Sequence, residues 1–167
     1  MLTVADLLEE LEQEARSTRR ALERVPDDKL EWRPHERSFT LGVLAMHIAT
    51  LPAAIAGVSV QAGFDAKTPV PRPSARSRAE LLETLDRSVA EAKRVLTEMG
   101  DAGLAEPWTM KDGEKELMSL PRGKFLRNVM LNHWYHHRGQ LTVYLRQVGA
   151  KVPAIYGASA DETPFPG

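Results

Sequence analysis

The sequence predicts an all-α protein, a four-helix bundle in a single domain over residues 1–167. Four long segments place apolar residues at spacings of three and four, the pattern of helices that bury one face. No segment of any length shows the two-residue alternation of a half-buried strand. Loops of about 15 residues or more join some of these helices and permit crossover connections.

The first helix is expected over residues 3–24, where the acidic residues come early and the basic residues late, as the helix dipole favours. Pro26 closes it. The next segment, 27–42, is polar and interrupted by Pro34, so we expect a loop anchored on the core by Leu30 and Trp32. The apolar face of the first helix comprises Val4, Leu7, Leu8, Leu11, Ala15, Thr18 and Leu22.

The second helix begins after a cap at Ser38 or Thr40. His47 lies on the flank of its apolar face, about 70° from the centre, and so faces a neighbouring helix. Considered alone, His47 is best interpreted as a partly exposed histidine without function. Pro52 predicts a kink or a break, because proline lacks the backbone N–H and clashes with the preceding turn. The apolar face comprises Leu41, Leu44, Ile48, Leu51, Ile55 and Val58.

Residues 62–77 hold three prolines without periodicity and are expected to form an exposed loop. Ser77 and Glu80 form a capping-box motif that begins a third helix, which ends before Gly100. Residues 101–120 are compatible with a short turn or hairpin, which the pattern does not decide. The apolar positions of the third helix are Leu81, Leu82, Leu85, Val89, Ala92, Val95 and Leu96.

The fourth helix covers 125–148, with Pro121 in its first turn and Gly149 just past its end. His133 and His137 fall inside its apolar stripe, one turn apart, with Cβ atoms about 6 Å from each other. Two interpretations stay open for this pair: ligands of one metal ion, or buried histidines satisfied by hydrogen bonds. The tail, 150–167, is extended and is expected to pack back along the bundle through Ile155 and Tyr156.

Composition excludes several classes of function. The chain has no cysteine, so disulfides, thiolate metal ligands and a cysteine nucleophile are excluded. The net charge is −1 with basic and acidic residues interspersed, so nucleic acid is not an expected partner. No apolar run is expected to reach the roughly 18 residues that span a bilayer, and the start lacks the pattern of a secretory signal. A cytoplasmic protein without a membrane partner is therefore expected.

Several motifs together resemble the DinB-like, or YfiT-like, family, whose members are described as metalloenzymes and are unrelated to the translesion polymerase. The resemblance covers nearly the whole chain. Its motifs are W-R-P at Trp32 to Pro34, a helix start with Ser38, Leu41, Leu44 and His47, H-x-x-x-H-R-G-Q-L at His133 to Leu141, and V-P-x-I-Y-G at Val152 to Gly157.

The resemblance implies an up-down-down-up bundle, often a homodimer, with a divalent metal held by His47, His133 and His137. His136 matches no ligand of the family pattern, in agreement with its place off the stripe. Relatives in the family include thiol transferases that use bacillithiol and isomerases that use mycothiol. A low-molecular-weight thiol is therefore a candidate cofactor, and a small molecule the expected substrate.

Three neutral imidazoles would leave a metal ion its full charge and an open position, as in catalytic sites. Such an ion lowers the pKa of bound water and favours the anionic form of a thiol. Imidazole ligands suit Zn, Ni, Cu and Fe; Zn or Ni is expected, and the sequence does not choose between them. Gln140 and Tyr144 are candidate helpers that orient a ligand or substrate, or else ordinary core residues. Arg138 is expected to pair with a carboxylate or to cross an interface.

Two functions of different class follow. The first is a metal-dependent enzyme, a transferase or hydrolase that activates a small thiol or water toward a small electrophile. The second is a non-catalytic metal-binding bundle with a structural or stress-related role. Proteolysis is a poor candidate because Trp134 and Tyr135 follow His133, where an H-E-x-x-H motif requires glutamate. An apolar cavity that opens onto the histidines would favour the enzyme.

Overall fold

The computed structural model describes residues 2–61 and 63–164 of the chain. The first residue of the predicted loop at 62–77 and the last three residues of the predicted tail lie outside this range. Buried residues from all four long helices form one hydrophobic cluster.

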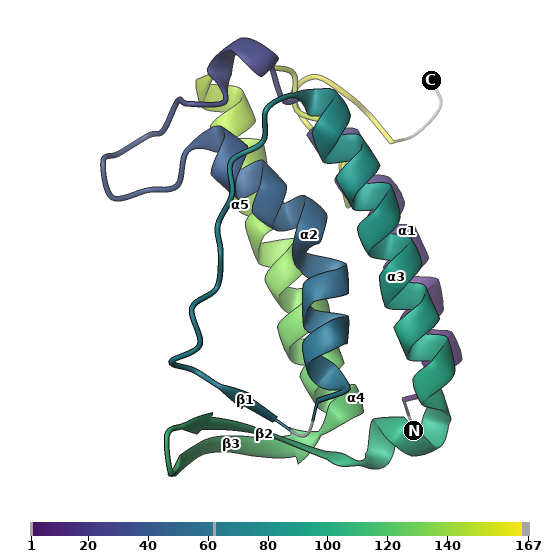
Figure 1. Ribbon diagram of the computed structural model, residues 1–167. Helices are drawn as coiled ribbons and strands as arrows, with labels where there is room; N and C mark the ends of the chain where they lie inside the picture. The colour runs from purple at the N-terminus through teal and green to yellow at the C-terminus, as the bar shows by residue number, and fades with distance from the viewer. Residues whose placement is uncertain (1, 62, 165–167) are drawn as a thin grey trace.

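Four long helices form the body of the molecule (Figure 1). They are α1 (Val4–Leu22), α2 (Leu41–Ser59), α3 (Arg78–Ala105) and a fourth composed of α4 (Arg122–Phe125), the π-helical segment η2 (Leu126–Leu131) and α5 (Asn132–Gln147). A short 3₁₀ helix, η1 (Asp27–Lys29), lies in the first loop. In Figure 1, α1 and α5 run upward and α2 and α3 downward, which gives the expected up-down-down-up order. α3 packs on α1 and α2, and α2 packs on α5.

A small mixed sheet corrects the all-α prediction. β1 (Gly63–Asp65) pairs parallel with β2 (Pro107–Asp112), which pairs antiparallel with β3 (Lys115–Pro121). The sheet lies at the lower end of the bundle, beside the start of the fourth helix (Figure 1). The three-residue β1 is too short for a visible alternation and its partner is remote in sequence, so local patterns do not reveal it.

Trp108 of β2 fixes the sheet to the bundle. Its indole is fully buried and stacks on the ring of Phe125 with 3.7 Å between ring centroids. The indole N–H donates to the carbonyl oxygen of Val58 at 3.1 Å. The isolated apolar residues of the segment 101–120 are therefore core contacts of a hairpin, whose turn has Gly113 at a φ of 60°.

The helix starts follow the predicted caps, except that the capping box of α3 is incomplete. Thr40, and not Ser38, caps α2 by accepting from the backbone N–H of Val43. Ser77 caps α3 by accepting from the N–H of Glu80 at 3.2 Å. The carboxylate of Glu80 accepts instead from the backbone N–H of Arg76, so the predicted capping box is only half formed.

Two backbone irregularities were expected at Pro52 and Gly100. Pro52 is buried within α2, which continues through it, so the helix does not break there and the alternative of a kink stays a prediction. The N–H of the next residue, Ala53, donates to the Ser88 hydroxyl of α3 at 3.0 Å, a contact that helps to hold the helix in place. Gly100 has a φ of 63° and interrupts α3 where the third helix was predicted to end. Gly149, at a φ of 78°, follows the end of α5 as predicted.

The connection from β1 to α3 crosses the whole length of the bundle along α2 (Figure 1). Its middle part, Pro69 to Pro73, is exposed as predicted, and we call it the strap. The connection is held at both ends: the Ala66 N–H donates to the Lys111 carbonyl, and the buried Ala75 donates to Gly42. This crossover allows α2 and α3 to run in the same direction.

The tail packs on the upper end of the bundle, as predicted. Ala154 is buried, and the carboxylate of Glu162 pairs with Arg20 and Arg24 at 2.5 Å each. Tyr156 differs from the expectation because its side chain remains 67% exposed and only its hydroxyl reaches inward. Charged pairs and the burial of Ala154 therefore both hold this segment on the bundle.

α2 overturns the expectation that no apolar run is long enough to cross a bilayer. Among the described residues, Leu41–Ser59 meets that test by length and composition, with 19 residues and a mean hydropathy of 1.9. Of its 18-residue apolar window, 56% is buried inside the protein, which is typical of a core helix.

Candidate metal centre

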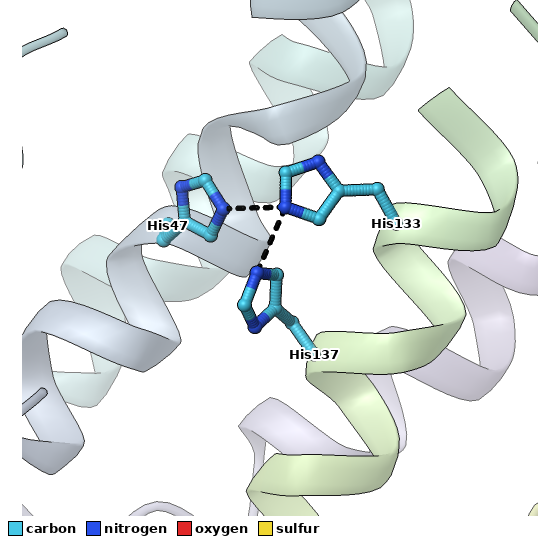
Figure 2. A group of neighbouring side chains, drawn as sticks. All are labelled: His47, His133 and His137. Atoms are coloured by element: carbon cyan, nitrogen blue, oxygen red, sulfur yellow. Dashed lines mark hydrogen bonds between the residues drawn. The ribbon is translucent and has the colours of Figure 1, made fainter. Parts of the chain in front are cut away.

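Three imidazoles from two helices point at one another (Figure 2). His47 comes from α2, and His133 and His137 come from successive turns of α5. The Nε2 atoms of His47 and His133 lie 3.4 Å apart, and those of His133 and His137 lie 2.8 Å apart. One nitrogen from each ring lies within 4.8 Å of the other two. The structure therefore brings together the three residues that the sequence put forward, while their binding of a metal stays a prediction.

The neighbouring Trp134 holds the two helices in register. Its buried indole donates to the carbonyl oxygen of Ile48 at 2.9 Å. Trp134 follows His133 in the chain, and Ile48 follows His47. A single hydrogen bond next to both histidines therefore fixes the distance between α2 and α5 where the imidazoles meet.

All three imidazoles are held in the neutral form. Partial burial, and to a smaller extent the neighbouring His137, His133 and Arg72, lower the pKa of His47 to about 4. Burial is also the main cause of the lowered pKa values of His133 and His137. Neutral imidazole carries the lone pair that a metal needs, so the cluster is in the state of a ligand set.

The geometry and the donor types fit a divalent ion. Tetrahedral bonds of about 2.1 Å place two ligand nitrogens about 3.4 Å apart, which equals the His47–His133 separation. His133 and His137 are closer than that and would have to separate slightly. The described cluster contains no carboxylate, so an ion bound there would keep its charge and have an open position.

Gln140 positions His137. The Nδ1 atom of His137 lies 2.9 Å from the side-chain oxygen of Gln140, which directs the Nε2 lone pair into the cluster. The Gln140 amide in turn donates to the Tyr144 hydroxyl at 3.4 Å, and the Trp32 ring packs edge-on against the Tyr144 ring. Neither Gln140 nor Tyr144 is among the residues that line the adjacent cavity. Their role as catalytic helpers stays a prediction.

His136 and Arg138 lie off the site, as their helical positions predicted. His136 is exposed and lies outside the cluster, although its ring contacts that of His137. Arg138 pairs with the carboxylate of Glu14 at 2.5 Å, which confirms the expected carboxylate partner. Sequence reasoning did not identify Glu14, although it lies between Leu11 and Thr18 on the apolar face of α1. A charge inside such a stripe is the signal that could have revealed it.

A cavity of about 650 Å³ opens beside the three histidines. Its walls are mainly apolar and come from α2, the sheet, the fourth helix and the strap. Arg72 is the only one of the described lining residues with a charged side chain. Sequence reasoning did not identify this lining, which includes Leu51, Ile55, Val58, Phe64, Val70, Trp108, Met110, Phe125 and Val129.

Comparison with known proteins agrees with the fold and the motifs. The sequence profile of the DinB family matches residues 1–164. The chain belongs to the DinB family. This DinB-family protein is 27% identical over 164 residues to the uncharacterised YrdA of Bacillus subtilis strain 168, with 96% of this chain and 92% of YrdA covered.

Solved structures share the fold of this DinB-family protein. A DinB-like protein from Bacillus cereus has a TM-score of 0.70 at 24% identity, covering 92% of this chain and 98% of that one. YjoA from Bacillus subtilis, also DinB-like, has a TM-score of 0.65 at 19% identity, covering 87% and 94%. A mycothiol-dependent maleylpyruvate isomerase has a TM-score of 0.52 at 14% identity, covering 90% of this chain and 62% of that longer chain.

Proposed function

We propose that this DinB-family protein is a metal-dependent enzyme that activates a low-molecular-weight thiol toward a small apolar electrophile, as a thiol S-transferase does. The observation that carries the proposal is the apolar cavity that opens directly onto His47, His133 and His137. A metal that only stabilised the bundle would need no such space. A divalent ion in this place, Zn or Ni, would supply a positive charge that lowers the pKa of a bound thiol.

The residues of the chain perform three tasks in this proposal. The three imidazoles hold the ion, and Gln140 orients one of them. The apolar walls bind the body of the electrophile and exclude water, which strengthens the interaction of an anionic sulfur with its partner. In the reaction the thiol loses its proton to solvent, the sulfur forms a bond to carbon, and the leaving group departs.

A thiol is favoured over water as the nucleophile. The described lining of the cavity contains no carboxylate that could act as a general base for a water molecule. A thiol ionises more readily and needs no such base. The fold shared with a mycothiol-dependent isomerase supports the same choice. Hydrolysis by activated water is the alternative within the enzyme class.

The test begins with elemental analysis of protein purified without a polyhistidine tag. The protein is then loaded with Co(II) and titrated with 2-mercaptoethanol. We expect a new sulfur-to-cobalt absorption band that is missing in His133→Ala. Turnover is measured with 2-mercaptoethanol and 1-chloro-2,4-dinitrobenzene, which yield the thioether, chloride and a proton. A Co(II) spectrum unchanged by the thiol, together with no transfer above the uncatalysed rate, would favour the non-catalytic metal-binding bundle.

We also propose that the protein forms a homodimer in solution. The support is the family resemblance and the apolar content of α2 and α3, and helical bundles commonly associate with two-fold symmetry. Sedimentation velocity at micromolar concentration tests the assembly state. A single species with the mass of one chain would reject the dimer.

A further inference from the structure

The strap places the guanidinium of Arg72 beside the cavity. The connection that contains Pro69 to Pro73 is fixed at both ends by backbone hydrogen bonds, and three prolines restrict the part between. Val70, Pro71, Arg72 and Pro73 of the strap all line the cavity. Arg72 is therefore held beside the cavity by a stiff segment and not by a freely moving loop.

Arg72 has no acidic partner. Within the described residues, its guanidinium forms no ion pair and no hydrogen bond, and it lies over the ring of Phe39. Arg76, a few residues further along the same connection, pairs with Glu80 at 2.9 Å. Among the residues that line the cavity, the charge of Arg72 has nothing of opposite sign to balance it.

The contact with Phe39 leaves the hydrogen-bonding edge of Arg72 available. The guanidinium carbon lies 5.1 Å from the centroid of the Phe39 ring, which also lines the cavity. The N–H donors of a guanidinium point outward in its plane, so a contact with an aromatic ring does not use all of them. Such an edge matches the two oxygens of a carboxylate.

We propose that the natural substrate has an apolar body and a carboxylate, and that Arg72 is the specificity-determining residue that binds this carboxylate. The inference rests on the proposed function, since it names the substrate class of the same site. A cavity of about 650 Å³ is of the size that holds small organic ligands. Apolar walls suit the body of such a molecule, and one cation suits one anionic group.

The test measures binding without thiol or turnover. The neutral fluorophore N-phenyl-1-naphthylamine is bound to the full-length protein as purified. It is then displaced by 4-phenylbutyrate or by 4-phenylbutan-1-ol, which differ in the carboxylate. We expect Arg72→Met to weaken the acid by about fivefold and to leave the alcohol unchanged. The difference in affinity for the acid between Arg72→Met and the unmodified protein should decrease in 1 M NaCl, because salt screens an ion pair near the surface.

Two further variants complete the test. Arg76→Met removes a guanidinium from the same connection but outside the cavity and should leave both compounds unchanged. Arg72→Gln repeats the loss of charge with a polar side chain. The proposal is overturned if Arg72→Met leaves the ratio of the affinities for the acid and the alcohol unchanged, or if Arg76→Met changes this ratio equally. It is also overturned if neither compound displaces the fluorophore. Because this readout needs no thiol, its failure is distinct from failure of the thiol-transfer assay.

Discussion

Two neighbouring residues of α5, His137 and Arg138, belong to two different polar clusters. One cluster is buried and paired within the protein, and the other lies beside an open cavity. Arg138 is 2% exposed and binds the carboxylate of Glu14, which is 5% exposed, together with the hydroxyls of Thr18 and Tyr156. Groups of the protein itself therefore neutralise the charge of Arg138 and accept its hydrogen bonds. His137 and its partners meet beside an open cavity with no carboxylate among them.

The difference indicates where a ligand is required. A buried charge must be matched inside the chain, because an unmatched one costs several kcal/mol. The three neutral imidazoles contact one another at 3.4 Å and 2.8 Å and have no charged partner, so they are available to an ion from outside. In the proposed function one helix therefore serves two purposes: its Arg138 face stabilises the fold, and its His137 face would bind the ion. The two faces should respond differently to substitution.

The largest expected effect concerns the metal. His133→Ala removes the central ligand of the cluster and should lower the metal content from about one ion per chain to near zero. Elemental analysis of the dialysed protein measures it. The matched control is His136→Ala on the same helix, which should retain its metal because that ring is exposed and lies outside the cluster. Equal losses in the two variants would contradict the ligand set.

The opposite face should affect folding and not metal. Arg138→Met leaves the carboxylate of Glu14 buried without its partner, which should lower the free energy of unfolding by about 3–5 kcal/mol. Urea denaturation measures the change, and metal content at saturating ion should stay the same. Arg146→Met removes an exposed pair with Asp161 and should cost much less. A loss of unfolding free energy in Arg138→Met no larger than in Arg146→Met would show that the buried pair stabilises little.

A third prediction concerns Gln140, which contacts His137 but is not in the cluster of three histidines. Gln140→Leu removes the acceptor that orients His137 and should weaken metal binding by about 10-fold to 100-fold without removing the ligands. Competition with a chelator of known affinity measures the change. Gln147→Leu, at an exposed position near the end of α5, is the control and should bind metal as the unmodified protein does. An unchanged affinity in Gln140→Leu would make Gln140 a packing residue only.

The smallest expected effects are the pH responses of the metal-free protein. The pKa of His47 falls from 6.5 to about 4 on folding, so the unfolded chain takes up more protons in this window and stability decreases as the pH falls from 6.5 toward 4. The pKa of Tyr156 rises from 10.0 to about 12, so the folded chain keeps its proton longer and stability decreases as the pH rises from 10 toward 12.

The losses of stability at acid and at alkaline pH, here called the acid limb and the alkaline limb, can be separated by substitution. Tm is measured as a function of pH. His47→Gln should make only the acid limb shallower, and Tyr156→Phe only the alkaline limb. Tyr135, whose pKa is also raised, keeps part of the alkaline limb in the second variant. If either substitution alters the opposite limb, the two clusters are coupled through α5.

Local patterns were sufficient for the helices and for the pair of histidines on the fourth helix. The spacings of three and four located all four long helices, and the pair His133 and His137 required only the helical period. His47 required the resemblance, because its flank position alone did not indicate a function. The sheet could not be predicted, since a three-residue strand has no period and pairs with a distant segment. Arg72 was missed for a related reason, because no local pattern tells which loop passes beside a cavity.

The π-helical segment η2 makes the length of the fourth helix adjustable. A π-helical turn closes its hydrogen bonds between residues i and i+5 and so holds more residues than an α-helical turn. Phe125 is fixed before η2 by its stack on Trp108, and His133 is fixed after it by the cluster. A one-residue deletion within Leu126–Leu131 should therefore be absorbed locally, and would alter the cavity wall near Val129 while sparing the imidazoles. A change of one residue in this segment would thus reshape the cavity wall independently of the proposed metal ligands.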